Sequence, residues 1–275
     1  MPKNGKVLSF ANFKGGVSKT SSTALVSYRL AKKGYKVLDI DFDAQANLTS
    51  LLLRTKASKG TTVDIDNTFM NAINSNIPLD KIAMGITKNL YLIPNAVDFY
   101  IYPKFLEEKF PGMNADAELK RVSFMRELIK PLRDKFDFIF LDVSPTMSLQ
   151  NDTAYYACDE VVIVLQTQSR SYDGANNLIS YLQKVLVDRY KAPIDILGVL
   201  PVLTKRYASV DKQILSDARA KYGNYVYRTV VHFMERVKRM DITGITDRPN
   251  DKWDQMVQNT YEKVANETIE RLKKA

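Results

Sequence analysis

The sequence predicts an α/β fold with a mostly parallel sheet that helices cover on both faces. Strand-like apolar runs alternate with helix-like stretches along the chain, which is typical of parallel strands joined by crossover helices. The runs are apolar at most positions, as expected for strands that are buried on both faces. The chain has 275 residues, 45% of them hydrophobic, so we expect a single domain over residues 1–275 with one large core.

The expected elements follow one another in a regular order. Residues 7–11 read as the first strand, and the helical pattern of residues 21–33 ends at Gly34. A second strand begins at Leu38. Later strands are expected at residues 89–94, 136–142, 159–166 and 194–203, and later helices at residues 171–190 and 253–275. Residues 54–88, rich in Asn, Thr and Lys, are expected to form an insertion.

The connection between the first strand and the first helix carries the strongest functional signal. A strand, a glycine-bearing turn and a helix N-terminus form a cradle for phosphate, because backbone N–H groups and the helix dipole both favour an anion. We expect Lys19 to reach the β- and γ-phosphates of ATP and the Thr20 hydroxyl to hold Mg²⁺. The expected ATP-binding residues are Lys14, Gly15, Gly16, Val17, Ser18, Lys19, Thr20 and Ser21. These features predict a sheet of the P-loop NTPase type.

The same segment departs twice from the usual pattern G-x-x-x-x-G-K-[ST], because Phe13 and Ser18 stand where glycines are usual. A second lysine, Lys14, precedes Lys19 by five residues. The form K-G-G-x-x-K-[ST] resembles the variant Walker A motif of the ParA/MinD superfamily, the SIMIBI-class ATPases that position DNA, division sites and other cargo. The resemblance implies a homodimer that forms face to face on ATP, in which Lys14 of each subunit reaches the other subunit's phosphates.

Residues 38–49 also resemble this family, whose sequence there is D-x-D-P-Q-x-N-x-T, with Ala44 in place of the proline. Asp41 and Asp43 would lie at the carboxyl end of the second strand, where ligands bind in open parallel sheets. The resemblance implies that Asp43 orients or activates the attacking water. Lys14, Lys19 and Asp43 are therefore the expected catalytic residues. Alternatively, the two carboxylates only cap the next helix.

The buried strand at residues 136–142 ends in Asp142, which resembles a Walker B carboxylate. Such a group binds Mg²⁺ through water rather than acting as a general base. The family usually has D-x-P-P here, and Ser144 replaces one of the prolines. The expected metal residues are Thr20, Asp41 and Asp142.

The charge of the chain suggests an anionic partner. Its 40 Lys and Arg residues exceed its 31 Asp and Glu residues, which gives a net charge of +9. Basic residues of the C-terminal half lie in segments that match the ParA region where the dimer binds DNA without sequence preference. The expected DNA-binding residues are Lys205, Arg206, Arg219, Arg236, Lys238 and Arg239. The alternative is a basic surface that is only solvated.

The C-terminal helix distinguishes DNA from a membrane as the partner. A MinD-type membrane ATPase would end in a short amphipathic anchor with bulky apolar residues on one face and basic residues on the other. Here the apolar stripe of residues 253–275 includes small and β-branched residues and is interrupted by Glu262, Glu267 and Glu270. We therefore expect this helix to pack on its own domain, which makes membrane attachment less favoured than DNA binding.

Taken together, these motifs resemble those of a plasmid or chromosome partition ATPase of the short ParA type, which lacks an N-terminal helix-turn-helix. Its ATP-bound dimer would bind DNA non-specifically, and a ParB-like centromere-binding partner would stimulate an otherwise slow hydrolysis. Adenine contacts are expected from loops near residues 201–204 and 231–234. The single cysteine, Cys158, suits a reducing cytosol, and no apolar run reaches ~18 residues, so we expect a cytoplasmic, nucleoid-associated protein.

Two other classes stay open at this point. A nucleotide-gated binding module with little hydrolysis is credible because the Ser18 side chain would crowd the phosphate cradle. A metabolic P-loop enzyme would share Lys14. A relative of nitrogenase reductase needs cysteines to hold an iron–sulfur cluster, which Cys158 alone cannot do. A relative of dethiobiotin synthetase needs a small-molecule pocket that the sequence does not reveal.

Overall fold

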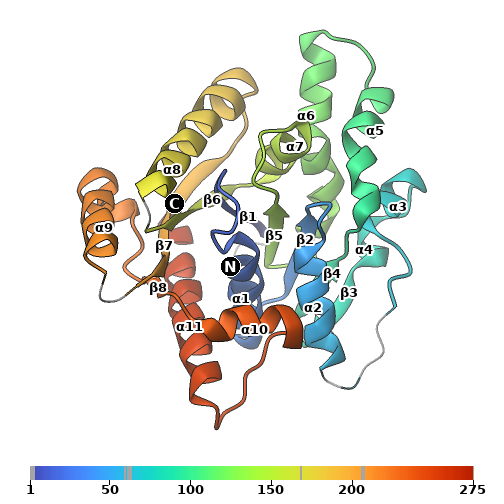
Figure 1. The fold of residues 1–275 in the computed structure, drawn as a ribbon. Coiled ribbons are helices and arrows are strands. Elements are labelled where there is room, and N and C mark those ends of the chain that lie inside the picture. The colour runs from blue at the N-terminus through green and yellow to red at the C-terminus, as the bar shows by residue number, and fades with distance from the viewer. Residues whose placement is uncertain (1–3, 59, 61–63, 168, 206–207, 275) are drawn as a thin grey trace.

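The core of the molecule is one twisted sheet (Figure 1). The computed structural model describes residues 4–58, 60, 64–167, 169–205 and 208–274, and within them eight strands pair in the order β3-β4-β2-β5-β1-β6-β7-β8. The pairing between β3 and β4 is antiparallel, and every other pairing between neighbours is parallel. The predicted mostly parallel sheet is therefore confirmed.

The strands and helices have the following bounds in the described residues. The strands are β1 (Lys6–Ala11), β2 (Val37–Phe42), β3 (Met84–Thr87), β4 (Leu90–Ile93), β5 (Phe138–Val143), β6 (Glu160–Gln166), β7 (Asp195–Thr204) and β8 (Val231–His232). The α-helices are α1 (Lys19–Lys32), α2 (Asn47–Ala57), α3 (Phe69–Asn74), α4 (Leu79–Ile82), α5 (Tyr102–Lys109), α6 (Ala115–Ile129), α7 (Leu149–Ala157), α8 (Ser169–Tyr181), α9 (Ser209–Tyr222), α10 (Glu235–Thr243) and α11 (Lys252–Leu272). Short 3₁₀ segments lie at Val97–Ile101, Lys130–Leu132 and Gly223–Tyr225.

Each face of the sheet has its own apolar core. Successive residues of a strand point to opposite faces, so β1 places Val7 in one core and Leu8 in the other. Helices α3, α5, α6, α7 and α8 pack on the face of Val7, and helices α1, α2, α10 and α11 pack on the face of Leu8. This double cover explains why the central strands are apolar at most positions.

The C-terminal helix packs on its own domain, as predicted. The side chains of Val257, Tyr261 and Val264 are buried in the core on the Leu8 face, to which α1 also contributes. Trp253 at the start of α11 is 52% exposed. Arg29 of α1 adds an ion pair with Glu262, with 2.6 Å between the guanidinium and carboxylate atoms. The apolar face of α11 is thus used within the fold. In the described part of the chain, no helix has the length and apolarity to cross a bilayer.

The structure adds detail to two of the expected segments. The helix expected over residues 171–190 is α-helical as far as Tyr181 and continues as a π-helix, Leu182–Arg189. Residues 54–88, expected as an insertion, contain the end of α2 and all of α3, α4 and β3. Phe69 and Leu79 of this range are buried in the core on the Val7 face of the sheet. The described part of the range is therefore integral to the domain, because its apolar residues cover one end of the sheet.

The strand order determines where a ligand can bind. β1 lies between β5 and β6, and the chain leaves β1 toward β2 but leaves β5 toward β6. Because these two connections run in opposite directions across the sheet, a crevice forms between the loops at the carboxyl ends of the strands. Ligands in open parallel sheets bind in this crevice. The loop after β1, which holds Lys14 and Lys19, lies there.

Candidate nucleotide-binding site

The loop after β1 is held in place by a buried asparagine that the sequence reasoning missed. The Asn12 side chain donates from Nδ2 to the backbone carbonyl of Val164 on β6 over 2.7 Å. Its Oδ1 accepts a hydrogen bond from the backbone N–H of Lys14 over 2.8 Å. Asn12 therefore ties the start of the loop to the neighbouring strand. Nothing in the sequence marks it, since its partner lies 152 residues further along the chain.

Two residues of the loop have the left-handed backbone conformation. Gly16 has φ of 70°, and Ser18 has φ of 63° immediately before α1 begins. A residue with a Cβ costs roughly 1–2 kcal/mol in this region, which explains why glycine is usual at the position of Ser18. The other unusual residue, Phe13, packs edge-on against Tyr181 of α8 with 5.4 Å between the ring centres. The loop thus contains both departures from the usual pattern and leads directly into α1, which begins at Lys19.

The two lysines of the motif point to different neighbours. The Lys19 ammonium donates to the backbone carbonyl of Lys14 over 3.1 Å, inside the loop. Burial lowers the pKa of Lys19, while the charges of Asp142 and Asp43 act in the opposite direction. The Lys14 ammonium donates instead to Oε1 of Gln166 at the end of β6, over 3.1 Å. The Lys19 ammonium thus lies inside the loop, and the Lys14 ammonium is directed toward the β6 side of it.

Two buried carboxylates lie side by side behind the loop. Asp41 on β2 and Asp142 on β5 are paired in register, and the side chains are 0% and 1% exposed. Burial raises the pKa of Asp142 to about 8; the charge of Asp41 adds to the rise, and a hydrogen bond from Thr20 opposes it. Burial also raises the pKa of Asp41 to about 6. Two such groups favour a cation between them and the phosphates of a ligand.

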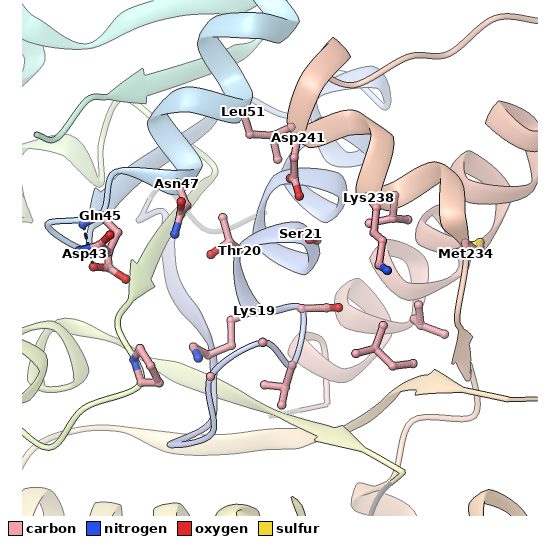
Figure 2. Close-up of a pocket in the computed structure, with 18 of the residues that line it drawn as sticks. Lys19, Thr20, Ser21, Asp43, Gln45, Asn47, Leu51, Met234, Lys238 and Asp241 are labelled. Carbon is pink, nitrogen blue, oxygen red and sulfur yellow. Dashed lines mark hydrogen bonds between the residues drawn. The ribbon is translucent and has the colours of Figure 1, made fainter.

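Asp41 and Asp43 have different surroundings. The Asp41 carboxylate accepts hydrogen bonds from the backbone N–H groups of Thr49, over 2.8 Å, and Asp43, over 3.2 Å. Asp41 therefore has the capping role that the sequence left open as an alternative. Asp43 accepts only locally, from the backbone N–H of Gln45 over 3.0 Å, and its side chain borders the cleft. Figure 2 shows Asp43 on the side of Thr20 that is opposite to α10.

A cleft of about 730 Å³ opens over the loop and the first turn of α1. Residues 15–21 form its floor, and Asp43, Gln45 and Asn47 border one end. The apolar side chains of Leu203, Val231, Phe233, Met234, Val237 and Tyr261 line the other end, and the polar residues Arg54, His232, Lys238 and Asp241 also line the cleft. The segments expected to contact adenine thus contribute to the apolar end. A phosphate-binding floor that continues into an apolar slot has the shape and chemistry for a nucleotide.

The described residues among the six that were expected to bind DNA lie on separate elements of the fold. Lys205, Arg219 and Arg239 are exposed, and Arg206 lies outside the described residues. Arg219 follows Ala218, which packs in one core, and Arg239 precedes Met240, which packs in the other. The helices α9 and α10 that carry these arginines therefore cover opposite faces of the sheet.

Arg236 and Lys238 occupy positions that the sequence did not suggest. Arg236 forms ion pairs with Asp251, over 2.7 Å, and Asp254, over 3.2 Å, and its side chain is only 15% exposed. It joins the start of α10 to the start of α11. Lys238 lines the nucleotide-sized cleft, with its side chain directed into it (Figure 2). Lys238 is exposed, like its neighbour Arg239, and no sequence signal shows that Lys238 lines the cleft and that Arg239 does not.

Comparison with known proteins finds a matching family model and relatives along nearly the whole chain. The family model described as an AAA domain matches residues 5–196. The chromosome-partitioning ATPase Soj of Treponema pallidum is 25% identical over 274 residues, which cover 97% of this chain and 98% of that protein.

Two solved structures share the fold. A plasmid partition protein from Borrelia burgdorferi, bound to AMPPNP, has a TM-score of 0.73 at 19% identity and covers 95% of this chain and 99% of its own. Cobyrinic acid a,c-diamide synthase from Mycobacterium smegmatis, with an ATP analogue and magnesium, has a TM-score of 0.75 at 19% identity. That likeness covers 95% of this chain and 93% of the synthase.

Proposed function

The chain belongs to the ParA/MinD family of ATPases, and from this membership we propose that it is a DNA partition ATPase driven by cycles of ATP binding and hydrolysis. The observation that carries the proposal is the joint placement of Lys19, Thr20 and Asp43 around one cleft at the carboxyl ends of β1 and β2. A phosphate-binding loop, a magnesium-holding hydroxyl and a carboxylate for the water are the groups that ATP hydrolysis needs.

The donor set fits Mg²⁺ as well as ATP. Magnesium prefers hard oxygen ligands and usually keeps several waters. The Thr20 hydroxyl faces the cleft, and the Asp142 carboxylate lies behind it with a hydrogen bond from Thr23 Oγ1 at 3.4 Å. Thr20 would hold the ion directly, and Asp142 would hold one of its waters. The ion would supply charge neutralisation for the phosphates, and it would also compensate the paired carboxylates Asp41 and Asp142.

The proposal of a homodimer depends on Lys14, and the proposal of a DNA-binding surface depends on exposed basic residues. Lys14 borders the loop on the β6 side rather than the cleft, so its charge is available to a second subunit's nucleotide after rearrangement of its contact with Gln166. Lys205, Arg219 and Arg239 are exposed, as contacts with DNA phosphates require, and none of the three lines the cleft. Because Arg219 and Arg239 lie on helices that cover opposite faces of the sheet, we expect the DNA-binding face to combine both subunits. A ParB-like protein would then stimulate hydrolysis and release the DNA.

A titration of unrelated DNA duplexes at several salt concentrations, with ATP, with ADP and without nucleotide, tests this function. We expect binding only with ATP, and a log–log salt slope of about −0.9 for each phosphate contacted. Arg239→Ala and Arg219→Ala should each weaken binding and flatten the slope. Binding that ignores the nucleotide, or tight ATP binding without turnover in the presence of DNA and partner, would contradict the proposal. The second outcome would indicate a nucleotide-gated binding module.

The packed face of α11 supports DNA over a membrane as the surface that the protein binds. The residues that would have to enter a lipid surface, Val257, Tyr261 and Val264, are buried against the rest of the domain. Sedimentation with vesicles that contain anionic lipid, with and without ATP, provides the comparison. Co-sedimentation that depends on ATP would favour a MinD-like role instead.

A further inference from the structure

Helix α10 forms one wall of the cleft. Met234, immediately before the helix, and Val237, Lys238 and Asp241 within it all line the cleft. Their spacing of three, four and seven residues from Met234 places them on one side of a helix. Figure 2 shows α10 passing over the first turn of α1, with Lys238 and Asp241 directed toward it. The remaining residues of α10, such as Arg239, do not line the cleft.

Both ends of this wall are anchored. At the start of α10, Arg236 binds Asp251 and the fully buried Asp254 of α11. At its end, the backbone N–H of Ile245 donates to Oγ1 of Thr55 on α2 over 2.8 Å. Gly244 lies so close to α2 that an added Cβ would be 2.4 Å from the backbone nitrogen of Thr55. The position of Lys238 in the cleft is therefore built into the fold.

Lys238 lies at the boundary between the two ends of the cleft. Figure 2 shows its side chain between Ser21, on the phosphate-binding turn of α1, and Met234, at the apolar end. Its ammonium lies over the ring of Phe233, 5.2 Å from the ring centre. In a nucleotide whose phosphates occupy the loop and whose base occupies the apolar end, the sugar and its first phosphate occupy this boundary. An ammonium at this boundary can donate hydrogen bonds to the oxygens of the sugar and of the negatively charged phosphate.

We propose that Lys238 is a nucleotide-binding residue that contacts the phosphate nearest the sugar of a bound nucleoside di- or triphosphate. The inference rests on the proposed ATP function and replaces the DNA contact that the sequence suggested for this residue. Because ADP and ATP share this phosphate, Lys238 contributes to the affinity for both. Lys19, by contrast, serves the far end of the phosphate chain.

The test compares Lys238→Gln with Lys252→Gln. Lys252 is also exposed and also lies over an aromatic ring, with 5.0 Å to the Trp253 ring centre, but it does not line the cleft. Affinity is measured by the fluorescence anisotropy of labelled ADP and ATP. A hydrogen bond from a charged donor corresponds to a loss of about 10-fold or more, so Lys238→Gln should weaken both nucleotides by that factor. Lys252→Gln should bind both like the unmodified protein.

A second measurement separates the nucleotide role from a DNA role. At a nucleotide concentration that saturates each variant, Lys238→Gln should bind DNA as tightly as the unmodified protein. Unchanged nucleotide affinity in Lys238→Gln would overturn the inference alone, and weakened DNA binding at saturation would return Lys238 to the DNA surface. If the unmodified protein bound neither ADP nor ATP, the proposed function itself would be contradicted. Thermal unfolding without nucleotide confirms that both variants fold.

Discussion

At the scale of single residues, Asp43 is the one of the three carboxylates at the ends of β2 and β5 that lines the cleft. Its neighbours Asp41 and Asp142 are buried behind the loop. If Asp43 positions the attacking water, Asp43→Ala should lower the rate of ATP hydrolysis by about 100-fold or more. ATP affinity, measured by anisotropy, should change little, because Asp43 does not contribute to the phosphate cradle. Near-normal turnover of this variant would assign the water to another group.

Asp152 predicts a pH dependence of stability. It accepts a hydrogen bond from the Tyr181 hydroxyl over 2.5 Å, and burial raises its pKa to about 6, while the Tyr181 bond and the charge of Arg189 oppose the rise. The folded protein therefore holds this proton more tightly than the unfolded chain. The free energy of unfolding should fall as the pH rises from about 4 to about 6 and then level off for this group.

Asp152→Asn keeps an acceptor for Tyr181 but cannot ionise. Relative to the unmodified protein, the variant should become more stable as the pH rises through this window. Two pKa units limit the gain to about 3 kcal/mol, and partial exposure makes it smaller. Urea unfolding of both proteins at pH 4 and pH 8 gives the comparison. A stability difference that is the same at both values would show that the carboxyl is not perturbed.

For single residues, the sequence could predict the site residues whose place depends only on the elements next to them in the chain. Lys19 and Thr20 line the cleft because they begin the helix that follows a strand and a turn, and this order is visible in the chain. Asn12 was missed because its role depends on Val164 of β6. The sequence assigns Lys238 to the DNA surface, because its place beside the cleft depends on how α10 docks on α2. Contacts of this kind are set by tertiary packing, which short-range patterns do not contain.

At the scale of elements, the docking of α10 on α2 depends on a single glycine. Gly244 has φ of 73°, and an added Cβ would be 2.4 Å from the backbone nitrogen of Thr55. Gly34, after α1, has φ of 95° but no atom within 4 Å of an added Cβ. Gly34→Ala should therefore cost about 1 kcal/mol from backbone strain alone, and Gly244→Ala about 2–4 kcal/mol from strain and overlap together.

Urea unfolding of the two variants measures this difference. Gly244→Ala should also weaken nucleotide binding if α10 must pack on α2 to hold its wall of the cleft, whereas Gly34→Ala should not. Equal stability losses in both variants would mean that α10 can move away from α2 without cost.

Elements were predicted well where one pattern dominates. β5 and β6 are continuous apolar runs, because both of their faces are covered, and they lie where the sequence placed them. The π-helix of Leu182–Arg189 was not predicted, since Leu182 and Leu186 are spaced for an ordinary α-helix and both are buried. Helices α3 and α4 were missed because each is short, with six and four residues, and has little periodicity of its own.

At the scale of the whole molecule, the proposal depends on a second subunit. Lys14 donates to Gln166 of its own chain, so reaching a partner's phosphate requires this contact to be exchanged. Lys14→Ala should leave nucleotide binding by the monomer largely intact, because Lys19 would still contact the phosphates. It should abolish the ATP-dependent dimer and the hydrolysis that needs it. Light scattering with ATP and with ADP follows the dimer, and a variant that dimerises normally would remove Lys14 from the interface.

The pairing of β1 also limits when the binding loop can take shape during synthesis. β1 ends at Ala11, but its two neighbours are β5, which begins at Phe138, and β6, which begins at Glu160. At a ribosome rate of about 5–20 residues per second, the first strand waits on the order of ten seconds for its partners. During that time an apolar segment is unpaired, which makes the nascent chain a client for chaperones. Ribosome-bound chains arrested before Glu160 should therefore retain no labelled ATP, and retention would mean that the loop forms without β6.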